Sequence, residues 1–457
     1  MSSKILIVEP SYRSKFPPLG LMRISTFHKD LGDEVTFIRG TNKYIREQSW
    51  DRIYVSSLFT YDLPKTVETI NYYSKFVERP KDNIIVGGIG ATLLPEYIEE
   101  KSQCKIITGL LDYSNALGLN ENPIAELIPD YDIVSSVKHE YRPINAYFTR
   151  VSIGCIRKCK FCAVPILEPN FKFLQNITLQ VNQIINKFGE KQDLIVLDNN
   201  ILALENIIEV IHEIKALGFE RSAKFEGRLR FVDFNQGIDA RLITPDIAKA
   251  LGKINIRPVR LAFDDIRMEN SYKKAIRLLA EQDFRYFTTY VLYNFNDNPK
   301  QFYERLRKNI ELSKKHSIRI TSFPMRFVPI DSVNRYHISD NWNWKFLRGV
   351  QCILNATHGM VSPLEDFFNI AFGKSYKEFI EILSMPDNYI IYRNKFKEQA
   401  NLWRQAFNRL SNEELQDLYD VFNLNHHNAY KYTFNNSNLN TLLYFYKNRG
   451  IKNLRNI

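Results

Sequence analysis

Short apolar runs alternate with amphipathic stretches through the first 125 residues of the chain. Four of these runs are mainly apolar and rich in β-branched residues, a pattern typical of strands that are buried on both faces. They are residues 4–8, 35–38, 53–58 and 83–88. The stretch from Leu19 to Leu31 instead has helical spacing. Strands that alternate with helices predict a parallel sheet with right-handed crossovers, so we expect a Rossmann-like domain over residues 1–125.

A second alternating series follows over residues 148–332. Its six expected strands are residues 150–153, 194–197, 231–234, 259–263, 289–293 and 320–323. Amphipathic stretches such as residues 177–188 and 245–251 lie between these strands. Six strand–helix units in this length predict a partial (β/α)6 barrel. In such barrels the chemistry is expected at the carboxyl ends of the strands.

The alternation of strand and helix patterns is absent on both sides of the expected barrel. Residues 126–147 contain prolines between the two series, so we interpret them as a linker. Residues 333–457 contain helical stretches such as residues 344–354 and 397–410, which predict a mainly helical domain. The expected fold class is therefore α/β, with a Rossmann-like parallel sheet, a barrel and a helical domain in chain order.

The five cysteines are unevenly distributed. Cys104 and Cys352 are isolated, whereas Cys155, Cys159 and Cys162 follow the first expected barrel strand within eight residues. A structural zinc site normally needs four protein ligands, and no fourth cysteine or histidine lies at a conventional spacing. A cubane iron–sulfur cluster usually takes four thiolates, so three would leave one iron open to another molecule. A zinc site or an inert cysteine loop remains the alternative.

The spacing C-x3-C-x2-C, with Phe161 directly before the last cysteine, resembles the radical S-adenosylmethionine (SAM) enzymes. The resemblance implies that Cys155, Cys159 and Cys162 hold a [4Fe-4S] cluster whose open iron binds SAM. It also implies a one-electron donor such as flavodoxin or ferredoxin. The expected function is reductive cleavage of SAM to modify an unreactive C–H position of an unidentified substrate.

The same resemblance places cofactor contacts in the cysteine loop and at the ends of the later strands. The candidates are Phe161, Asp198, Asn199, Asn200, Gln236, Arg241, Asp264, Asn294 and Arg326. Asp264 is expected to accept from ribose hydroxyls, and Arg326 to pair with a carboxylate. Asp239 offers a helix cap. For each strand-end residue, a role in a turn or a salt bridge stays open.

Parts of the amino-terminal domain resemble the cobalamin-binding domains that are fused to some radical SAM enzymes. The matching elements are residues 17–21, Ser56-Ser57-Leu58 and Gly87-Gly88, whose small residues would let a corrin tail approach the backbone. The DxHxxG element with the lower axial histidine is missing, since His28 and His139 do not lie in that pattern. The resemblance implies either a cobalamin-dependent methyltransferase or a domain retained for structure or substrate recognition.

Two residues beyond the barrel are candidates for catalysis. Cys352 is suited to relay a radical or to accept a group, and His358 follows it by six positions. In a helix this spacing puts the two side chains on different faces, so they need not act together. A buried apolar thiol with no catalytic role is the other interpretation of Cys352.

The net charge of +11 leaves a nucleic-acid partner open. Basic residues beside aromatic residues can bind phosphates and stack on bases. Such groups are Tyr444, Phe445, Tyr446, Lys447, Arg449, Lys452 and Arg455, and the run Arg221, Lys224, Arg228 and Arg230. A nucleic-acid-binding protein with a structural metal loop is therefore the alternative from a different functional class.

Cysteine usage and hydropathy bear on the compartment. Five unevenly placed cysteines do not make a disulfide framework, which favours a reducing, cytoplasmic setting. No apolar run reaches the roughly 18 residues that a membrane span needs. We therefore expect no membrane partner.

Overall fold

The computed structural model describes residues 2–45, 48–423 and 437–447. The chain divides into two compact units, one of Met1–Arg260 with Val328–Tyr336 and one of Leu261–Phe327 with His337–Ile457. The division falls inside the segment expected to form a barrel. Parallel sheets and helices alternate along the chain, so the mixed α/β class is confirmed. The partial barrel and the domain limits at 125, 147 and 332 stay predictions.

In the described part of residues 1–125, five parallel strands form one sheet in the order β2-β1-β3-β4-β5. The strands are β1 (Lys4–Glu9), β2 (Glu34–Arg39), β3 (Arg52–Ser57), β4 (Ile84–Gly88) and β5 (Lys105–Ile106). The four strands predicted from apolar runs are confirmed. The chain changes direction across the sheet between β1 and β3, and this switch point is where doubly wound sheets bind ligands.

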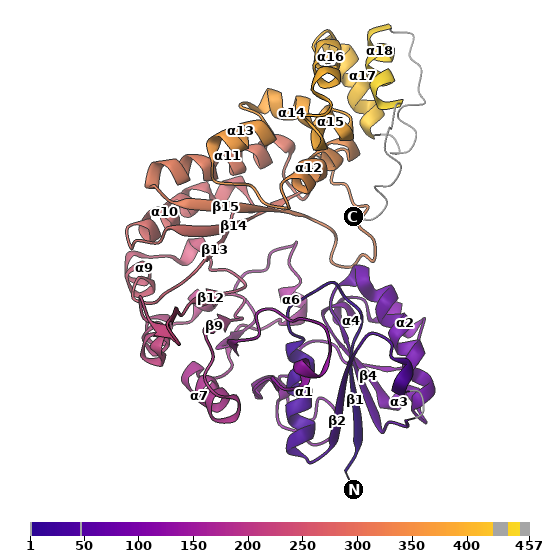
Figure 1. Cartoon of the computed structure of the whole chain (residues 1–457), viewed down its shortest axis with the longest axis vertical. Helices are drawn as coiled ribbons and strands as arrows, with labels where there is room; N and C mark the ends of the chain where they lie inside the picture. Colours follow the sequence, from indigo (N-terminus) through magenta and orange to yellow (C-terminus); the bar gives the residue numbers. More distant parts are fainter. Residues whose placement is uncertain (1, 46–47, 424–436, 448–457) are drawn as a thin grey trace. The chain divides into compact units, whose positions relative to one another are not determined.

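Helices cover both faces of this sheet, with α1 on one face and α2 and α3 on the other (Figure 1). Their bounds are α1 (Leu19–Asp30), α2 (Leu63–Tyr73), α3 (Pro80–Asn83), α4 (Ile89–Leu93) and α5 (Pro95–Glu99). Alternate strand residues such as Leu6, Val8 and Ile53 pack against Leu63 and Ile70 of α2. Because strand side chains alternate between the two faces, a sheet with helices on both sides needs the uninterrupted apolar runs seen in the sequence.

Residues 126–147 are a packed segment of the first unit. Arg23 Nε of α1 donates to the Leu127 carbonyl at 2.9 Å, and Ser25 Oγ donates to Asp130 Oδ2 at 2.7 Å. These bonds fix the first part of the predicted linker along α1.

A second parallel sheet of the first unit has the order β12-β9-β6. Its strands are β6 (Ala146–Thr149), β9 (Asp193–Val196) and β12 (Val232–Phe234), and the helices that follow them are α7 (Ile177–Phe188), α8 (Ile207–Ile214) and α9 (Pro245–Leu251). Asn176 caps α7 by accepting from the Leu179 amide, and Thr244 caps α9 by accepting from the Ile247 amide.

The strand predicted over residues 150–153 is wrong. The sheet strand β6 ends at Thr149, and β7 (Ser152–Ile153) pairs antiparallel with β8 (Lys172–Phe173). The amides of Val151 and Ser152 donate to a side chain, as described below, and cannot continue the pairing with β9. The chain therefore leaves the sheet four residues earlier than its apolar pattern predicts.

The second unit contains a sheet in the order β13-β14-β15. Its elements are β13 (Val259–Ala262), which begins just before the division, α10 (Glu269–Ala280), β14 (Tyr286–Tyr293), α11 (Pro299–His316) and β15 (Arg319–Arg326). A capping box between Asn298 and Gln301 begins α11, with Pro299 at its first position. Five of the six strands predicted for the barrel thus lie in two sheets of three strands each in the described residues, and β6 takes the place of the sixth.

A fully buried arginine of α11 joins the strand ends of the second unit. Arg305 Nη1 donates to the carbonyls of Phe263 and Leu292 at 2.9 and 2.7 Å, and its Nη2 contacts Asp297 Oδ2 at 2.5 Å. A buried charge is tolerated only with such partners. Arg305 therefore holds the ends of β13 and β14 and the loop before α11 in one arrangement.

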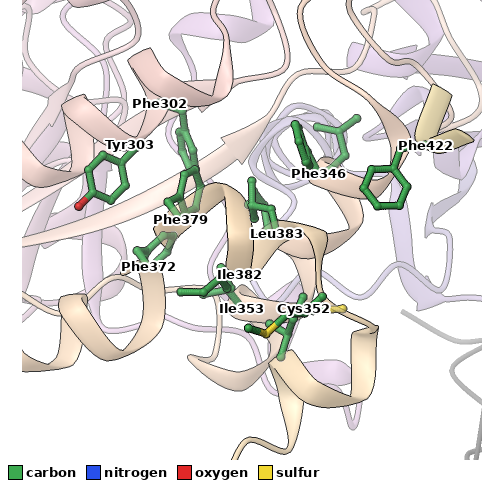
Figure 2. Packing of buried hydrophobic residues seen from close by; sticks show 14 of the residues in the cluster. Phe302, Tyr303, Phe346, Cys352, Ile353, Phe372, Phe379, Ile382, Leu383 and Phe422 are labelled. Carbon is green, nitrogen blue, oxygen red and sulfur yellow. The ribbon is translucent and has the colours of Figure 1, made fainter. Parts of the chain in front are cut away.

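Helices that follow β15 build a large apolar core (Figure 2). They are α12 (Trp344–Ala356), α13 (Glu365–Phe372), α14 (Tyr376–Ser384), α15 (Asp387–Ile391), α16 (Lys397–Phe407), α17 (Asn412–Asn423) and α18 (Ser437–Lys447). Phe346 and Cys352 of α12 lie in one cluster with Phe379 and Leu383 of α14. A glycine at the α12–α14 crossing is required, since a Cβ on Gly349 would stand 2.7 Å from the Leu383 carbonyl oxygen.

Two observations bear on the expected partners. Arg230 of the internal basic run is buried, and its guanidinium lies 4.0 Å from the centre of the Phe219 ring, so this run is not a continuous exposed basic surface. Arg449, Lys452 and Arg455 lie outside the described residues.

Among the described helices, none combines the length and the apolar content that a membrane crossing needs.

Replacement of Arg305 tests how far the second unit depends on this buried charge. We expect Arg305→Met to lower the free energy of unfolding by about 3–5 kcal/mol, because the change leaves Asp297 buried without its partner. Arg277→Met is the matched control, since Arg277 forms an exposed pair with Glu281 and should cost only about 0.3–0.5 kcal/mol. Urea unfolding followed by circular dichroism measures both. Equal losses in the two variants would contradict the assignment.

Candidate functional site

The three clustered cysteines lie on an irregular loop between β7 and the short helix α6 (Val164–Leu167). All three side chains are half-buried, and the Cys162 amide donates to the Cys159 carbonyl at 3.0 Å. Gly154 begins the loop with φ of +77°, and a Cβ there would overlap the Asn170 carbonyl group, 2.7 Å from its carbon. Only glycine therefore lets the chain turn into the cysteine loop this close to the neighbouring backbone.

A buried carboxylate fixes the start of the loop. Asp198 directly follows β9, and its two oxygens accept from the Val151 amide at 3.0 Å, the Ser152 amide at 2.5 Å and Ser152 Oγ at 2.6 Å. Burial raises the pKa of this carboxyl above its ordinary value, and the three donors oppose that rise. Asp198 was predicted as a cofactor contact, and the structure gives it a positioning role between β6 and the cysteine loop.

Glu168 fixes the other end of the loop. It directly follows α6 and forms an ion pair with Arg150. Its carboxylate also accepts from the Gly154 amide at 2.6 Å and from Asn199 Nδ2 at 2.7 Å. One carboxylate thus connects the residue before the first cysteine, the end of β9 and the segment after α6. Asn199, another predicted cofactor contact, is held in place by this bond.

Two arginines beside the loop share one carboxylate. Asp239 Oδ2 accepts from Arg157 Nε at 3.1 Å, and Asp239 Oδ1 accepts from Arg241 Nε at 2.7 Å. Burial favours a raised pKa for Asp239, but the bonds from Arg241 and Arg157 lower it below its ordinary value. The pKa of Arg241 is raised by Asp239 and also by the charges of Cys159 and Cys155. Positive charge is therefore fixed next to two of the three thiols.

Asp239 also accepts from the Arg241 amide at 3.0 Å and caps the 3-10 turn Ala240–Leu242, so the predicted cap is confirmed. Gln236, from the same strand end, is exposed and contacts the neighbouring Asn235 at 3.4 Å. Its expected contact with the cofactor stays a prediction.

Asn200 contacts the first cysteine. Its Nδ2 donates to Cys155 Sγ at 3.4 Å, and the Arg157 amide donates to the same sulfur at 3.3 Å. Asn200 is 3% exposed, and within the described residues its Oδ1 has no hydrogen-bond partner. A buried acceptor without a donor costs free energy, so this oxygen is suited to a donor from a bound molecule.

The loop fits an iron–sulfur cluster in the type and number of its donors. Its three cysteines form no disulfide, and N–H groups already point at the sulfur of Cys155, as such groups do around clusters. Across residues 2–45, 48–423 and 437–447, no three His, Cys, Asp or Glu side chains surround one point in a metal-binding arrangement. The thiols of Cys155, Cys159 and Cys162 would therefore turn toward a common centre when a cluster binds, and Phe161 stays a predicted contact.

Asn294, a predicted cofactor contact in the second unit, has a structural role. Its side chain is fully buried, and Nδ2 donates to the carbonyls of Phe327 and His337, each at 3.1 Å. Its Oδ1 accepts from the Ser339 amide at 3.0 Å. Both donor hydrogens are thus used within the protein, and the amide joins the end of β14 to the chain after β15.

The other two predicted contacts of the second unit also have partners in the protein. Asp264 Oδ1 accepts from the Leu292 amide at 3.0 Å, and Arg326 Nη2 donates to the His337 carbonyl at 2.9 Å. Both side chains are half-buried. Their roles toward a cofactor stay predictions.

The catalytic candidates Cys352 and His358 have different environments. Cys352 is 0% exposed, and burial raises the pKa of its thiol to about 12, so it remains protonated in the apolar core (Figure 2). A buried, protonated thiol without contact to solvent is typically unreactive. His358 is exposed, with φ of +54°, in the turn that ends α12.

Sequence reasoning missed three residues that shape the loop, namely Glu168, Arg157 and Gly154. A carboxylate six positions after the last cysteine was a visible signal for Glu168. Arg157 is one of several basic residues in the motif, and nothing in the sequence singles it out. The need for Gly154 depends on the backbone of Asn170, which only the fold brings near.

No family model matches the chain, and no curated protein matches it significantly. Among solved structures, coproporphyrinogen III oxidase from Escherichia coli, described as a radical SAM enzyme, is 15% identical with a TM-score of 0.29, covering 43% of this chain and 47% of that one. SuiB from Streptococcus suis bound to S-adenosylmethionine is 12% identical with a TM-score of 0.31, covering 46% and 47%. SuiB bound to the precursor peptide SuiA is 13% identical with a TM-score of 0.32, covering 52% and 54%.

These matches span about half the length of each solved structure. Their TM-scores are too low to establish a shared fold. The function proposed below therefore rests on the residues of this chain.

Substitution of Gly154 tests whether its backbone conformation shapes the loop. Gly154→Ala should destabilise the first unit and reduce the iron bound after anaerobic reconstitution, because the new Cβ overlaps Asn170. Gly227→Ala is the control, since Gly227 also has a positive φ but nothing lies within 4 Å of its Cβ position. The control should cost only the left-handed strain of about 1–2 kcal/mol and keep its iron. Equal iron in both variants would refute the steric argument.

Proposed function

We propose that this protein is a radical SAM enzyme whose [4Fe-4S] cluster is held by Cys155, Cys159 and Cys162. The observation that carries the proposal is a C-x3-C-x2-C loop held at the carboxyl ends of β6 and β9 by Asp198 and Glu168. When bound, the cluster would supply the electron that cleaves SAM reductively. The reaction on the substrate would be removal of hydrogen from an unreactive C–H position.

The residues around the loop have separate tasks in this proposal. Asp198 and Glu168 hold the loop, so the three thiols stay on one short segment that leaves a strand end. The free Oδ1 of Asn200 is suited to accept from the amino group of SAM. Arg241 and Arg157 share the Asp239 carboxylate, which holds both guanidinium groups at the loop. An external one-electron donor such as flavodoxin or ferredoxin is required.

The first test replaces the three cysteines together. After anaerobic reconstitution with iron and sulfide, the wild-type protein should bind about four irons per chain and form 5′-deoxyadenosine from SAM with a strong reductant. Cys155→Ala, Cys159→Ala and Cys162→Ala combined should abolish both, because no thiolates remain on the loop. Iron analysis, visible absorption and chromatography of the products measure the outcome.

Cys104→Ala is the matched control for the triple variant. Cys104 is half-buried, and its sulfur lies 3.7 Å from Ser102 Oγ, away from the loop in sequence. It should keep the iron content and the product yield. Stoichiometric zinc without iron in the wild-type protein, or unchanged spectra in the triple variant, would overturn the proposal in favour of a structural metal loop.

The second test concerns Asn200. Asn200→Leu keeps the size of the side chain and removes its acceptor, so SAM should bind roughly 10-fold or more weakly, since a bond to a charged group is worth about 1.5–3 kcal/mol. Equilibrium dialysis with the reconstituted protein measures the dissociation constant. Gln236→Leu, at an exposed side chain, tests the other predicted contact in parallel. Unchanged affinity with full iron content would exclude Asn200 from the binding site.

A further inference from the structure

The carboxyl end of the amino-terminal sheet is the place where a cobalamin would bind. A corrin tail at this end needs an open slot beside the switch point between β1 and β3 and near the glycines that end β4. The small residues of Ser56-Ser57-Leu58 and Gly87-Gly88 predicted such a slot. The packing of these residues tests whether the slot exists.

The helix α4 is packed directly on the strand ends. Ser57 Oγ donates to the Gly87 carbonyl at 3.0 Å and accepts from the Ala91 amide at 2.6 Å. A Cβ on Gly88 would overlap the Ser57 carbonyl oxygen, and a Cβ on Gly90 would stand 3.4 Å from Ser57 Cβ. The small side chains thus serve the close approach of the chain to itself. Between these described residues no space remains for a ligand.

A buried tyrosine fills the β1 side of the switch point. Tyr12 follows β1 and is only 2% exposed. Its hydroxyl donates to the Ser56 carbonyl at 3.0 Å and shares a bond of 2.6 Å with Thr66 Oγ1 on α2. The Tyr12 ring therefore occupies the space between the ends of β1 and β3, where a ligand would otherwise contact the backbone.

The last residue of β1 is covered as well. Glu9 is 3% exposed, and its carboxylate accepts from the Tyr141 hydroxyl and from Arg39 Nε at 3.1 Å. Tyr141 comes from the segment after the sheet, so this segment covers the strand end. Loss of Tyr141 or Arg39 would leave this carboxylate buried without its donors, which is costly.

His28 cannot serve as a lower axial ligand, and one ring nitrogen of His139 is engaged within the protein. His28 is 1% exposed, with Nδ1 bonded to Asp33 Oδ2 at 2.7 Å and Nε2 bonded to the Tyr54 hydroxyl at 2.9 Å. His139 uses Nε2 to contact the Ser14 carbonyl at 3.1 Å. Both nitrogens of His28 are thus occupied, and His139 holds a loop.

From this packing we infer that the amino-terminal domain does not bind cobalamin and that the reaction of this protein is cobalamin-independent. The residues that resemble a corrin site instead pack α4 on the sheet, and α4 contacts α6, the helix after the cysteine loop. The ion pair of Lys172 and Asp112 at 3.0 Å adds a second connection between this domain and the loop region. The part of the inference that concerns the reaction rests on the proposed function, whereas the part that concerns binding stands without it.

Cobalt content tests the inference on the full-length protein. One preparation is produced in cells supplied with hydroxocobalamin, so that the domain can fold around the cofactor, and a second is incubated with it after anaerobic reconstitution. After gel filtration, elemental analysis and the corrin absorption bands report what is retained. We expect no retained cobalt in either preparation. About one cobalt per chain in either would overturn the inference.

Iron and product measurements on the same samples separate this result from the proposed function. Iron and 5′-deoxyadenosine without cobalt, at a yield that added cobalamin does not change, support both statements. A sample that lacks iron, 5′-deoxyadenosine and cobalt contradicts the proposed function and still supports the exclusion of the corrin. A yield of 5′-deoxyadenosine or S-adenosylhomocysteine that depends on added cobalamin overturns the inference about the reaction.

Discussion

The bonds between the Asp198 carboxylate and the backbone of Val151 and Ser152 decide where the cysteine loop begins. They take the place of further pairing of β6 with β9, which ends at Thr149. A buried carboxylate must be satisfied by donors, and the nearest strong donors are these N–H groups. The chain therefore leaves the sheet at Thr149, turns at Gly154 and carries its three cysteines beyond the strand ends. Everything proposed for the site depends on this exit.

In both units, a single polar side chain with several hydrogen-bond partners fixes irregular backbone. Glu168 and Asp239 in the first unit and Arg305 in the second each join loops or strand ends through several hydrogen bonds. Each fixes irregular backbone that has no sheet or helix partners of its own. Loops held in this way are suited to carry chemistry, because their functional side chains keep one position. Each of these side chains stabilises its loop only while all of its hydrogen-bond partners are present.

The amino-terminal domain shows that one set of small residues supports two different arrangements. Gly88, Gly90 and Ser57 would allow a flat ligand to approach the backbone, and they equally allow α4 to pack on the strands. The local sequence is the same in both cases. The difference lies in Tyr12 and Tyr141, which come from other parts of the chain and fill the remaining space.

The sequence by itself determined four strands of the first sheet and the helix α1, and it predicts the cysteine loop as a metal-binding segment. Periodicity reports which face of each element is buried, and cysteine spacing is a local property. The break after Thr149, the pairing of Arg157 with Asp239 and the structural use of Asn294 were decided by the tertiary structure alone. The hydrogen-bond partner of a polar side chain is the group that the fold brings close to it. Asp198, for example, accepts from Ser152, which lies 46 positions earlier in the chain.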